Sequence, residues 1–201
     1  MRYSNISNNP SERTNVIMPY VYSEDVFTSD EVDTICEYFA NNLSFIQSTD
    51  AQDEMRVCKF KFFRKGDDND WIFQKLNDII YKLNDENYGF ELTGYQWLQY
   101  TEYHGEDSGK YDFHMDTLLG DSAPNFPTRK LSLTLLLSDP ESDYQGGNFE
   151  FNMGPENKPL SIEMKKGSII VFPSFMIHRV TPVTEGTRKS IVIWVTGPKF
   201  T

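Results

Sequence analysis

The chain has 201 residues, of which 14% are aromatic and 24% are charged, and it carries a formal net charge of −11. A chain of this length buries a sizeable core, and its aromatic content is typical of a packed globular protein rather than a disordered one. Because no run of lysine and arginine offsets the negative charge, binding to nucleic acid or to an anionic membrane is disfavoured.

The N-terminus and the cysteines indicate the compartment. Met1–Ile6 lacks the apolar run of a signal peptide, and no stretch approaches the length of a membrane span. Cys36 and Cys58 fall in a helix-like and a strand-like run, so we interpret them as reduced core thiols rather than as a disulfide or a metal pair. We therefore predict a soluble cytoplasmic protein with no nucleic-acid and no membrane partner.

The front of the chain predicts a helix behind a polar arm and a short strand. Residues 1–15 are polar and are expected to form a loosely held arm, and 16–22 are an apolar strand candidate. Thr28 is a hydroxyl cap followed by the acidic Asp30 and Glu31, the pattern of a helix start. Apolar side chains then recur at helical spacing, namely Val32, Ile35, Cys36, Phe39 and Leu43.

A strand, a turn, a second helix and another strand follow. The alternation of residues 56–63 predicts the strand, and 66–70 predicts a turn that ends in a helix cap. The second helix is expected over 71–84 and the next strand region over 90–103. The acidic turn lacks the spacing and the twelfth-position glutamate of a calcium loop, so we interpret it as a solvated turn.

After residue 100 the pattern changes from helical to β. Short β-rich runs separated by turns are typical of a sandwich or barrel. We expect a single domain over 1–201 of α+β class, mainly β, in which 16–99 supplies helical support and the first strands and 100–198 forms the core. The predicted strands are 130–137, 148–152, 160–164, 168–172, 178–180 and 189–195.

Alternation within the first of these strands separates two faces. Ser132, Thr134 and Leu136 share one face, whereas the other leucines of the run share the opposite one. The more polar face is expected to line a pocket.

The strongest local signal is a His-x-Asp motif at His114 and Asp116, with a distant partner at His178. On a strand, two side chains separated by one residue point to the same face and can grip one ion. His178 is the best candidate for a third ligand, because a buried strand and a turn at 173–174 return the chain just before it. Two imidazoles and one carboxylate form the ligand set of non-haem Fe(II) oxygenases, and a buried histidine hydrogen-bonded to an aspartate is the ordinary alternative.

Residues 103–195 resemble the iron(II)- and 2-oxoglutarate-dependent dioxygenases, specifically the prolyl 4-hydroxylase-like branch with its small microbial hydroxylases. Each segment alone is weak, but together and in the family's order they are specific. The segments are GKYDFHMD at 109–116, LSLTLLLSDP at 131–140, YQGGNF at 144–149, KGSIIVFP at 166–173 and HRVTPVTEGTRKS at 178–190.

The resemblance implies a double-stranded β-helix, a jelly-roll or cupin-like barrel with the N-terminal helices packed on one sheet. It assigns His114, Asp116 and His178 as catalytic Fe(II) ligands and Arg188 as the partner of the distal carboxylate of 2-oxoglutarate. A planar guanidinium suits this role because it binds a carboxylate bidentately and stays charged when buried. The residues around Arg188 alone, which follow a predicted turn at Gly186, would instead predict a charged side chain exposed at the surface.

Four further residues are expected around the cosubstrate. Tyr103 resembles a tyrosine that hydrogen-bonds it in this branch, with Tyr100 as the competing choice. Ser190 and Trp194 occupy strand positions near Arg188, and Thr134 lies on the pocket-facing side of its strand. Core or strand packing is an alternative role for each of them.

The resemblance implies a hydroxylase that uses Fe(II), 2-oxoglutarate and O2, with ascorbate as an accessory reductant, and that releases succinate and CO2. The carboxylate at Asp116 favours hydroxylation over halogenation. Branch membership suggests a prolyl residue in a peptide or protein as substrate. Residues 117–129 are long enough to form a lid, and the chain is expected to be a monomer or a weak homodimer.

Three other functions stay open from the sequence. The substrate of the same reaction can be a free amino acid or another small metabolite. A jelly-roll binding module without catalysis would not need to keep His114, Asp116, His178 and Arg188 together. A zinc-dependent hydrolase can use the same three ligands, but no glutamate is placed beside a ligand as general base and Arg188 would have no role.

Overall fold

The computed structural model describes residues 18–41, 46–48, 55–117 and 127–200. The helices are α1 (Ser29–Asn41) and α2 (Asp70–Asn87), with short 3-10 turns η1 (Asp67–Asn69) and η2 (Gly105–Asp107). The strands are β1 (Val21–Ser23), β2 (Ile46–Ser48), β3 (Arg56–Phe63), β4 (Gly94–His104), β5 (Lys110–His114), β6 (Thr128–Leu136), β7 (Tyr144–Gly146), β8 (Phe149–Phe151), β9 (Leu160–Ile162), β10 (Ile169–Pro173), β11 (His178–Val180) and β12 (Val183–Gly197).

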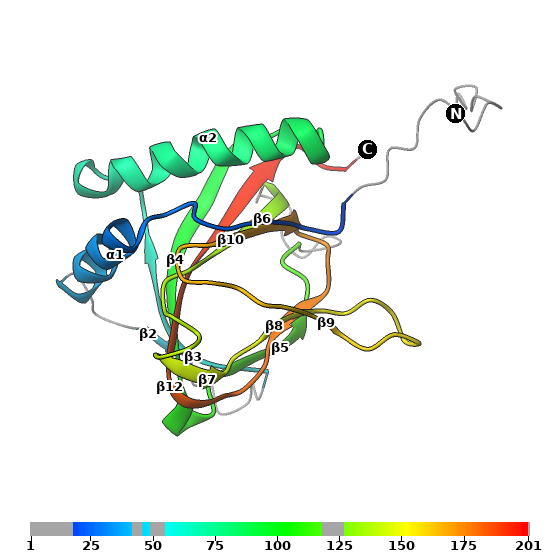
Figure 1. Ribbon diagram of the computed structural model, residues 1–201. Helices are drawn as coiled ribbons and strands as arrows, with labels where there is room; N and C mark the ends of the chain where they lie inside the picture. The colour runs from blue at the N-terminus through cyan, green and yellow to red at the C-terminus, as the bar shows by residue number, and fades with distance from the viewer. Residues whose placement is uncertain (1–17, 42–45, 49–54, 118–126, 201) are drawn as a thin grey trace, which may run out of the picture.

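These strands form a 12-stranded sheet in the order β1-β10-β6-β12-β4-β3-β5-β11-β8-β9, with β2 beside β3 and β7 beside β12. The sheet curls on itself, and both helices lie on the outer side of the curl (Figure 1). Strand β12 is the centre of the arrangement, because it pairs with β4 along one edge and with β6 along the other. The mainly β architecture with helices on one face is confirmed.

Local sequence signals set the helix ends. The backbone N–H of Thr28 donates to Glu31 Oε2 at 2.8 Å and the N–H of Glu31 donates to Thr28 Oγ1 at 3.3 Å, a reciprocal capping box that starts α1 as predicted. Helix α2 runs beyond the predicted residue 84. It ends where Gly89, at φ 64°, donates its N–H to the carbonyl of Asn84 at 2.7 Å, a left-handed cap that glycine adopts without strain.

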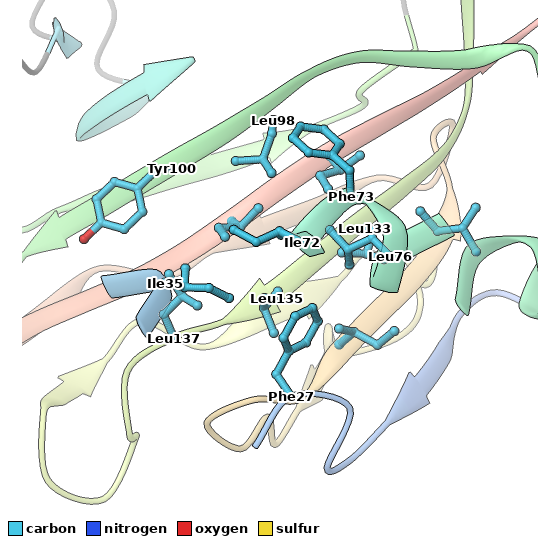
Figure 2. Close-up of a cluster of buried hydrophobic side chains, with 14 of the residues drawn as sticks. Phe27, Ile35, Ile72, Phe73, Leu76, Leu98, Tyr100, Leu133, Leu135 and Leu137 are labelled. Carbon is cyan, nitrogen blue, oxygen red and sulfur yellow. The ribbon is translucent and has the colours of Figure 1, made fainter. Parts of the chain in front are cut away.

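A first hydrophobic core lies between the helices and the outer face of the sheet. Figure 2 shows Ile35 of α1 and Leu76 of α2 facing Leu133 and Leu135 of β6, with Leu98 of β4 beside them. A second core fills the inside of the curl. It is built from Tyr103, Leu136, Phe149, Phe151, Ile170, Phe172 and Val183, among others.

Strand β6 divides its side chains between these two cores as its alternation predicts. Leu131, Leu133 and Leu135 belong to the helix-side core, whereas Leu136 belongs to the inner one. The polar face of β6 therefore points into the curl, where Thr134 lines a cavity.

Several predicted bounds change. Of the predicted first strand, the structure describes residues 18–22, and among these only 21 and 22 belong to β1. The register of β1 is set by pairing of Tyr22 with Ile170 of β10. Strand β12 is longer than 189–195 because two neighbouring strands hold it along its length. The predicted arm at 1–15, Leu43 and the lid residues 118–126 lie outside the described residues.

The structure also bears on the predictions about the two cysteines and about membrane spans. Cys36 is half-buried and Cys58 is buried, and both thiols are free. No helix in the described part of the chain is long and apolar enough to cross a membrane. The cytoplasmic location stays a prediction.

Candidate metal centre

The two candidate histidine ligands face each other across neighbouring strands. His114, the last residue of β5, is the register partner of His178, the first residue of β11. Directly opposed residues of an antiparallel pair project to the same face. The imidazole centroids accordingly lie 4.3 Å apart. Pairing of β5 with β11 therefore joins residues that are far apart in the sequence.

Asp116 reaches the same point by a different route from the predicted one. Strand β5 ends at His114, so strand alternation does not orient Asp116, which lies in the bend that follows. Its backbone N–H donates to the carbonyl of Ser174 at 3.0 Å. Its Oδ2 accepts a hydrogen bond from Ser132 Oγ at 2.6 Å, and this hydroxyl lies 3.0 Å from Ser174 Oγ. The turn before β11 thus holds the carboxylate as well as the second histidine.

The potential ligand atoms of the three side chains all lie within 4.8 Å of one another. Nδ1 of His114 lies 2.8 Å from the carbonyl of Asp112, and Nδ1 of His178 lies 2.9 Å from the carbonyl of Met176. Because a carbonyl can only accept, each Nδ1 carries the proton and each Nε2 presents its lone pair toward Asp116. This second layer of contacts orients imidazoles for metal binding.

The electrostatics of the cluster also suit a cation. Burial opposes ionisation of Asp116, but His178, His114 and the Ser132 hydroxyl outweigh it and hold the pKa of Asp116 below its usual value. Burial lowers the pKa of His178, and the nearby Asp116 does not fully offset this. Metal binding requires an ionised carboxylate and a neutral imidazole, so the pKa shifts of Asp116 and His178 both lie in the direction that favours a divalent metal.

Arg188 lines the same cavity as the three candidate ligands. Its side chain is only 1% exposed, and Nη1 donates to Ser190 Oγ at 3.2 Å. Its positive charge partly offsets the rise that burial causes in the pKa of Tyr144, and the guanidinium lies 5.7 Å from the ring centre of Tyr103. The exposed turn charge suggested by local context is therefore wrong, because β12 carries Arg188 into the curl.

Buried polar atoms without partners in the described structure identify what this cavity can hold. They include Nε of Arg188, Nε1 of Trp194 and Oε1 of Gln99, and all three residues line the cavity. Buried donors and acceptors are costly when left unpaired, so a ligand with negative charge and oxygen acceptors would satisfy the two donors. A small dicarboxylate that also chelates a metal beside His114 and His178 fits this donor set.

The structure separates the residues predicted around the cosubstrate. Tyr103, Thr134, Ser190 and Trp194 all line the cavity. Tyr100 does not, because it faces the helix-side core, where its ring stacks on that of Phe39 at 4.6 Å and its hydroxyl donates to Glu102.

Two cavity residues that carry polar groups escaped the sequence analysis. Gln99 lies four residues before Tyr103 on β4 and so shares its face, a strand periodicity that could have found it. Tyr111 stacks on the imidazole of His114 with ring centres 3.5 Å apart. The position of Tyr111 in the GKYDFHMD segment does not predict this stacking. Residues three apart on a regular strand face opposite sides, and the pairing of β5 with β11 has a register shift at this point.

Sequence comparison places residues 98–196 in the 2OG-Fe(II) oxygenase superfamily, whose sequence model matches them. A PKHD-type hydroxylase of Shewanella sp. (strain ANA-3) is 32% identical over 96 residues, which cover 48% of this chain and 41% of that protein. A PKHD-type hydroxylase of Synechococcus sp. (strain CC9311) is 38% identical over 90 residues, 45% of this chain and 38% of that protein. The matched stretch thus spans less than half the length of these curated relatives.

Solved structures show the same fold at low sequence identity. A prolyl-4-hydroxylase from Pseudomonas putida has a TM-score of 0.72 and 15% identity, covering 90% of this chain and 94% of that one. The viral collagen prolyl hydroxylase of Paramecium Bursaria Chlorella virus-1, solved as a 2OG complex, has a TM-score of 0.68 and 19% identity, covering 89% and 96%. The curled sheet is therefore a double-stranded β-helix, as expected.

The segment that matches the superfamily also supplies the three clustered candidate ligands and Arg188. Sequence similarity and side-chain geometry thus agree on one part of the molecule. On this agreement, residues 98–196 belong to the 2OG-Fe(II) oxygenase superfamily.

Proposed function

We propose that the protein is a 2-oxoglutarate- and O2-dependent hydroxylase that acts on a prolyl residue in a peptide or protein. The observation that carries the proposal is one cavity lined by His114, Asp116 and His178 together with the buried cation of Arg188. Bound Fe(II), with 2-oxoglutarate and O2, would supply the oxidation, in which a substrate C–H becomes C–OH while 2-oxoglutarate yields succinate and CO2.

The chain's own side chains bind and orient in this scheme. His114, Asp116 and His178 would hold Fe(II) from one side and leave the opposite positions open. Arg188 would bind the distal carboxylate of 2-oxoglutarate, with Ser190 fixing the guanidinium at 3.2 Å. The apolar inner core around Phe149 and Phe172 would exclude water from the reacting groups.

The cosubstrate would lie between the metal and Arg188, in the part of the cavity lined by Tyr103, Thr134 and Trp194. The Trp194 indole N–H is a buried donor without a partner in the described structure, so it suits a carboxylate or keto oxygen. Burial raises the pKa of Tyr103, which keeps its hydroxyl protonated and able to donate.

An exposed aromatic shelf next to the cavity supports a peptide rather than a free amino acid. Phe62 and Trp97 are 37% and 38% exposed, and their ring centres lie 4.9 Å apart. The ring of Phe62 also lies 6.4 Å from that of Trp194, which lines the cavity. Aromatic surfaces of this kind dock extended proline-containing chains. A structural neighbour, the prolyl hydroxylase of Trichoplax adhaerens, was itself solved with a peptide fragment.

The first test is an anaerobic titration of the Fe(II)-loaded protein with 2-oxoglutarate, followed by the weak visible charge-transfer band of a chelated 2-oxo acid. We expect the band in the wild type and its loss in His178→Ala. Arg188→Ala should keep Fe(II) binding but weaken 2-oxoglutarate binding by about 2 kcal/mol, or roughly thirtyfold. Iron binding without any band would overturn the proposal.

The substrate is tested separately by succinate release. Proline-containing peptides should stimulate release and gain one oxygen atom by mass, whereas free amino acids should not. Stimulation by a free amino acid alone would leave the hydroxylase intact but contradict the prolyl peptide as substrate.

A further inference from the structure

Gly147 packs directly against the side chain of Arg188. It sits in the turn before β8 with φ 60°, and its N–H donates to the carbonyl of Pro182 at 3.0 Å. A Cβ at this position would lie 3.0 Å from Cδ of Arg188, 2.8 Å from Cγ2 of Val183 and 3.2 Å from Cε2 of Tyr144. The contact with Val183 is shorter than real Cβ atoms make, and the other two are tighter than most, so a side chain here would displace its neighbours.

Arg188 stands between two cavities. Together with Phe149 it lines the cavity of the metal centre, and the same two residues line a second cavity on the other side. Gly147 and Tyr144 line that second, rear cavity. The candidate metal ligands therefore line the cavity on one side of Arg188, and Gly147 lines the rear cavity on the other side.

The polar contacts of Arg188 fix the position of its guanidinium. The position of its aliphatic stem is set instead by the backbone of Gly147. Ser190 Oγ accepts a hydrogen bond from Nη1, and the guanidinium acts electrostatically on the nearby Tyr144 side chain. Among the atoms of Arg188, the one nearest to a Cβ built on Gly147 is Cδ, in the aliphatic stem, at 3.0 Å. Val183, which is fully buried, closes the remaining side of this contact.

We propose that Gly147 sets the length of the cosubstrate cavity, by allowing the stem of Arg188 to lie against a backbone that has no Cβ. This inference rests on the proposed function, in which the 2-oxo acid end is at the metal and the distal carboxylate is at Arg188. A Cβ would push the stem away from the rear cavity and toward the metal. The site would then favour a 2-oxo dicarboxylate one methylene shorter than 2-oxoglutarate.

The test compares Gly147→Ala with Gly89→Ala. Both glycines have φ near +60°, at 60° and 64°, but a Cβ on Gly89 meets nothing within 4 Å. The two variants therefore share the backbone strain and differ in the contact with Arg188. Each Fe(II)-loaded protein is titrated anaerobically with 2-oxoglutarate and with oxaloacetate, using the charge-transfer band for affinity and the ligand-induced rise in Tm as a second readout.

We expect the affinity ratio of 2-oxoglutarate to oxaloacetate to fall about tenfold in Gly147→Ala, because sub-ångström misplacement of a clamp weakens binding strongly. The ratio should stay at the wild-type value in Gly89→Ala. A ratio that is unchanged in Gly147→Ala, or that falls equally in both variants, would overturn the inference.

A second variant keeps the inference testable if Gly147→Ala folds poorly. Val183→Ala combined with Gly147→Ala removes the shortest of the three contacts and leaves the one with Arg188. We expect the same fall in the ratio, and a wild-type ratio in this double variant would also contradict the inference. Absence of any band in the wild type would instead contradict the proposed function, so the two failures are distinguishable.

Discussion

At the scale of single residues, Asp116 is the negatively charged member of the candidate metal centre. Its two carboxylate oxygens each lie 3.6 Å from the Nε2 atom of a histidine, one from His114 and the other from His178. Without a cation, the hydrogen bond from the Ser132 hydroxyl offsets part of the cost of burying this carboxylate. A divalent metal would replace this partial compensation by direct coordination, so Asp116 should matter far more for metal binding than for folding.

Asp116→Ala is therefore expected to abolish Fe(II) binding and turnover while leaving the fold largely intact. Iron binding is measured by equilibrium dialysis under argon, and the fold by far-UV circular dichroism. The matched control is Asp112→Ala, since Asp112 lies on the neighbouring strand β5 and its carboxylate pairs with Lys110 instead, at 2.8 Å. Wild-type turnover in Asp116→Ala would remove Asp116 from the ligand set.

At the scale of elements, the turn between β10 and β11 organises the metal centre. The Ser174 carbonyl accepts the backbone N–H groups of Asp116 and Thr117, each at 3.0 Å. Ser132 of β6 joins the carboxylate and the Ser174 hydroxyl in one buried network. The bend after β5 is thus held by two other strands, which places the carboxylate without help from β5 itself.

Ser132→Ala is expected to weaken Fe(II) binding by roughly tenfold to a hundredfold, the usual effect of losing a hydrogen bond to a metal ligand. The carboxylate would remain but would rotate more freely. Ser161→Ala on the exposed side of β9 is the control and should bind iron like the wild type. Equal iron affinity in the two variants would show that Ser132 plays no part in orienting Asp116.

The aromatic shelf on β3 and β4 gives a second prediction at this scale. Trp97→Ala should raise KM for a proline-containing peptide about tenfold, since an exposed aromatic anchor contributes on the order of 1–2 kcal/mol to binding. Its affinity for 2-oxoglutarate should not change. Tyr81→Ala on α2, where the side chain is 63% exposed, controls for the loss of a surface aromatic. A matching rise in KM for Tyr81→Ala would argue against the shelf.

At the scale of the whole molecule, the two cores have separate roles. The helix-side core packs α1 and α2 on one face of the curled sheet (Figure 1, Figure 2). The inner core lies beside the candidate metal cavity, which Tyr103, Phe149 and Val180 of this core help to line. Strand β6 contributes to both, because its odd-numbered leucines face the helices while Ser132 and Thr134 face inward. Stability and chemistry are therefore divided between opposite faces of the same strands.

Leu133→Ala in the helix-side core should lower the free energy of unfolding by about 3 kcal/mol, because the side chain is fully buried and its removal leaves a cavity. Urea denaturation measures the loss. Ile177→Ala, with a side chain that is 39% exposed, should change the stability far less. Fe(II) affinity of the folded Leu133→Ala protein should stay near the wild-type value, and a large loss would contradict the separation of the two cores.

Much of the local structure could be predicted from the sequence because its causes are local. The capping box of Thr28 and Glu31 starts α1, and the alternation of 56–63 matches β3 residue for residue. The two faces of β6 also follow from period two alone. Strand lengths were predicted less well, because β1 and β12 take their bounds from the strands beside them.

The sequence by itself determined the secondary-structure types, the polar face of β6 and the presence of a His-x-Asp motif with a later histidine, since all of these depend on side-chain chemistry and short-range spacing. Only the tertiary structure decided that Asp116 is held by the turn at Ser174, that Tyr103 rather than Tyr100 faces the cavity, and that Gly147 lies behind Arg188. These are contacts between segments distant in the chain, and they depend on strand register and on the curl of the sheet. Neither is encoded in any one stretch of residues.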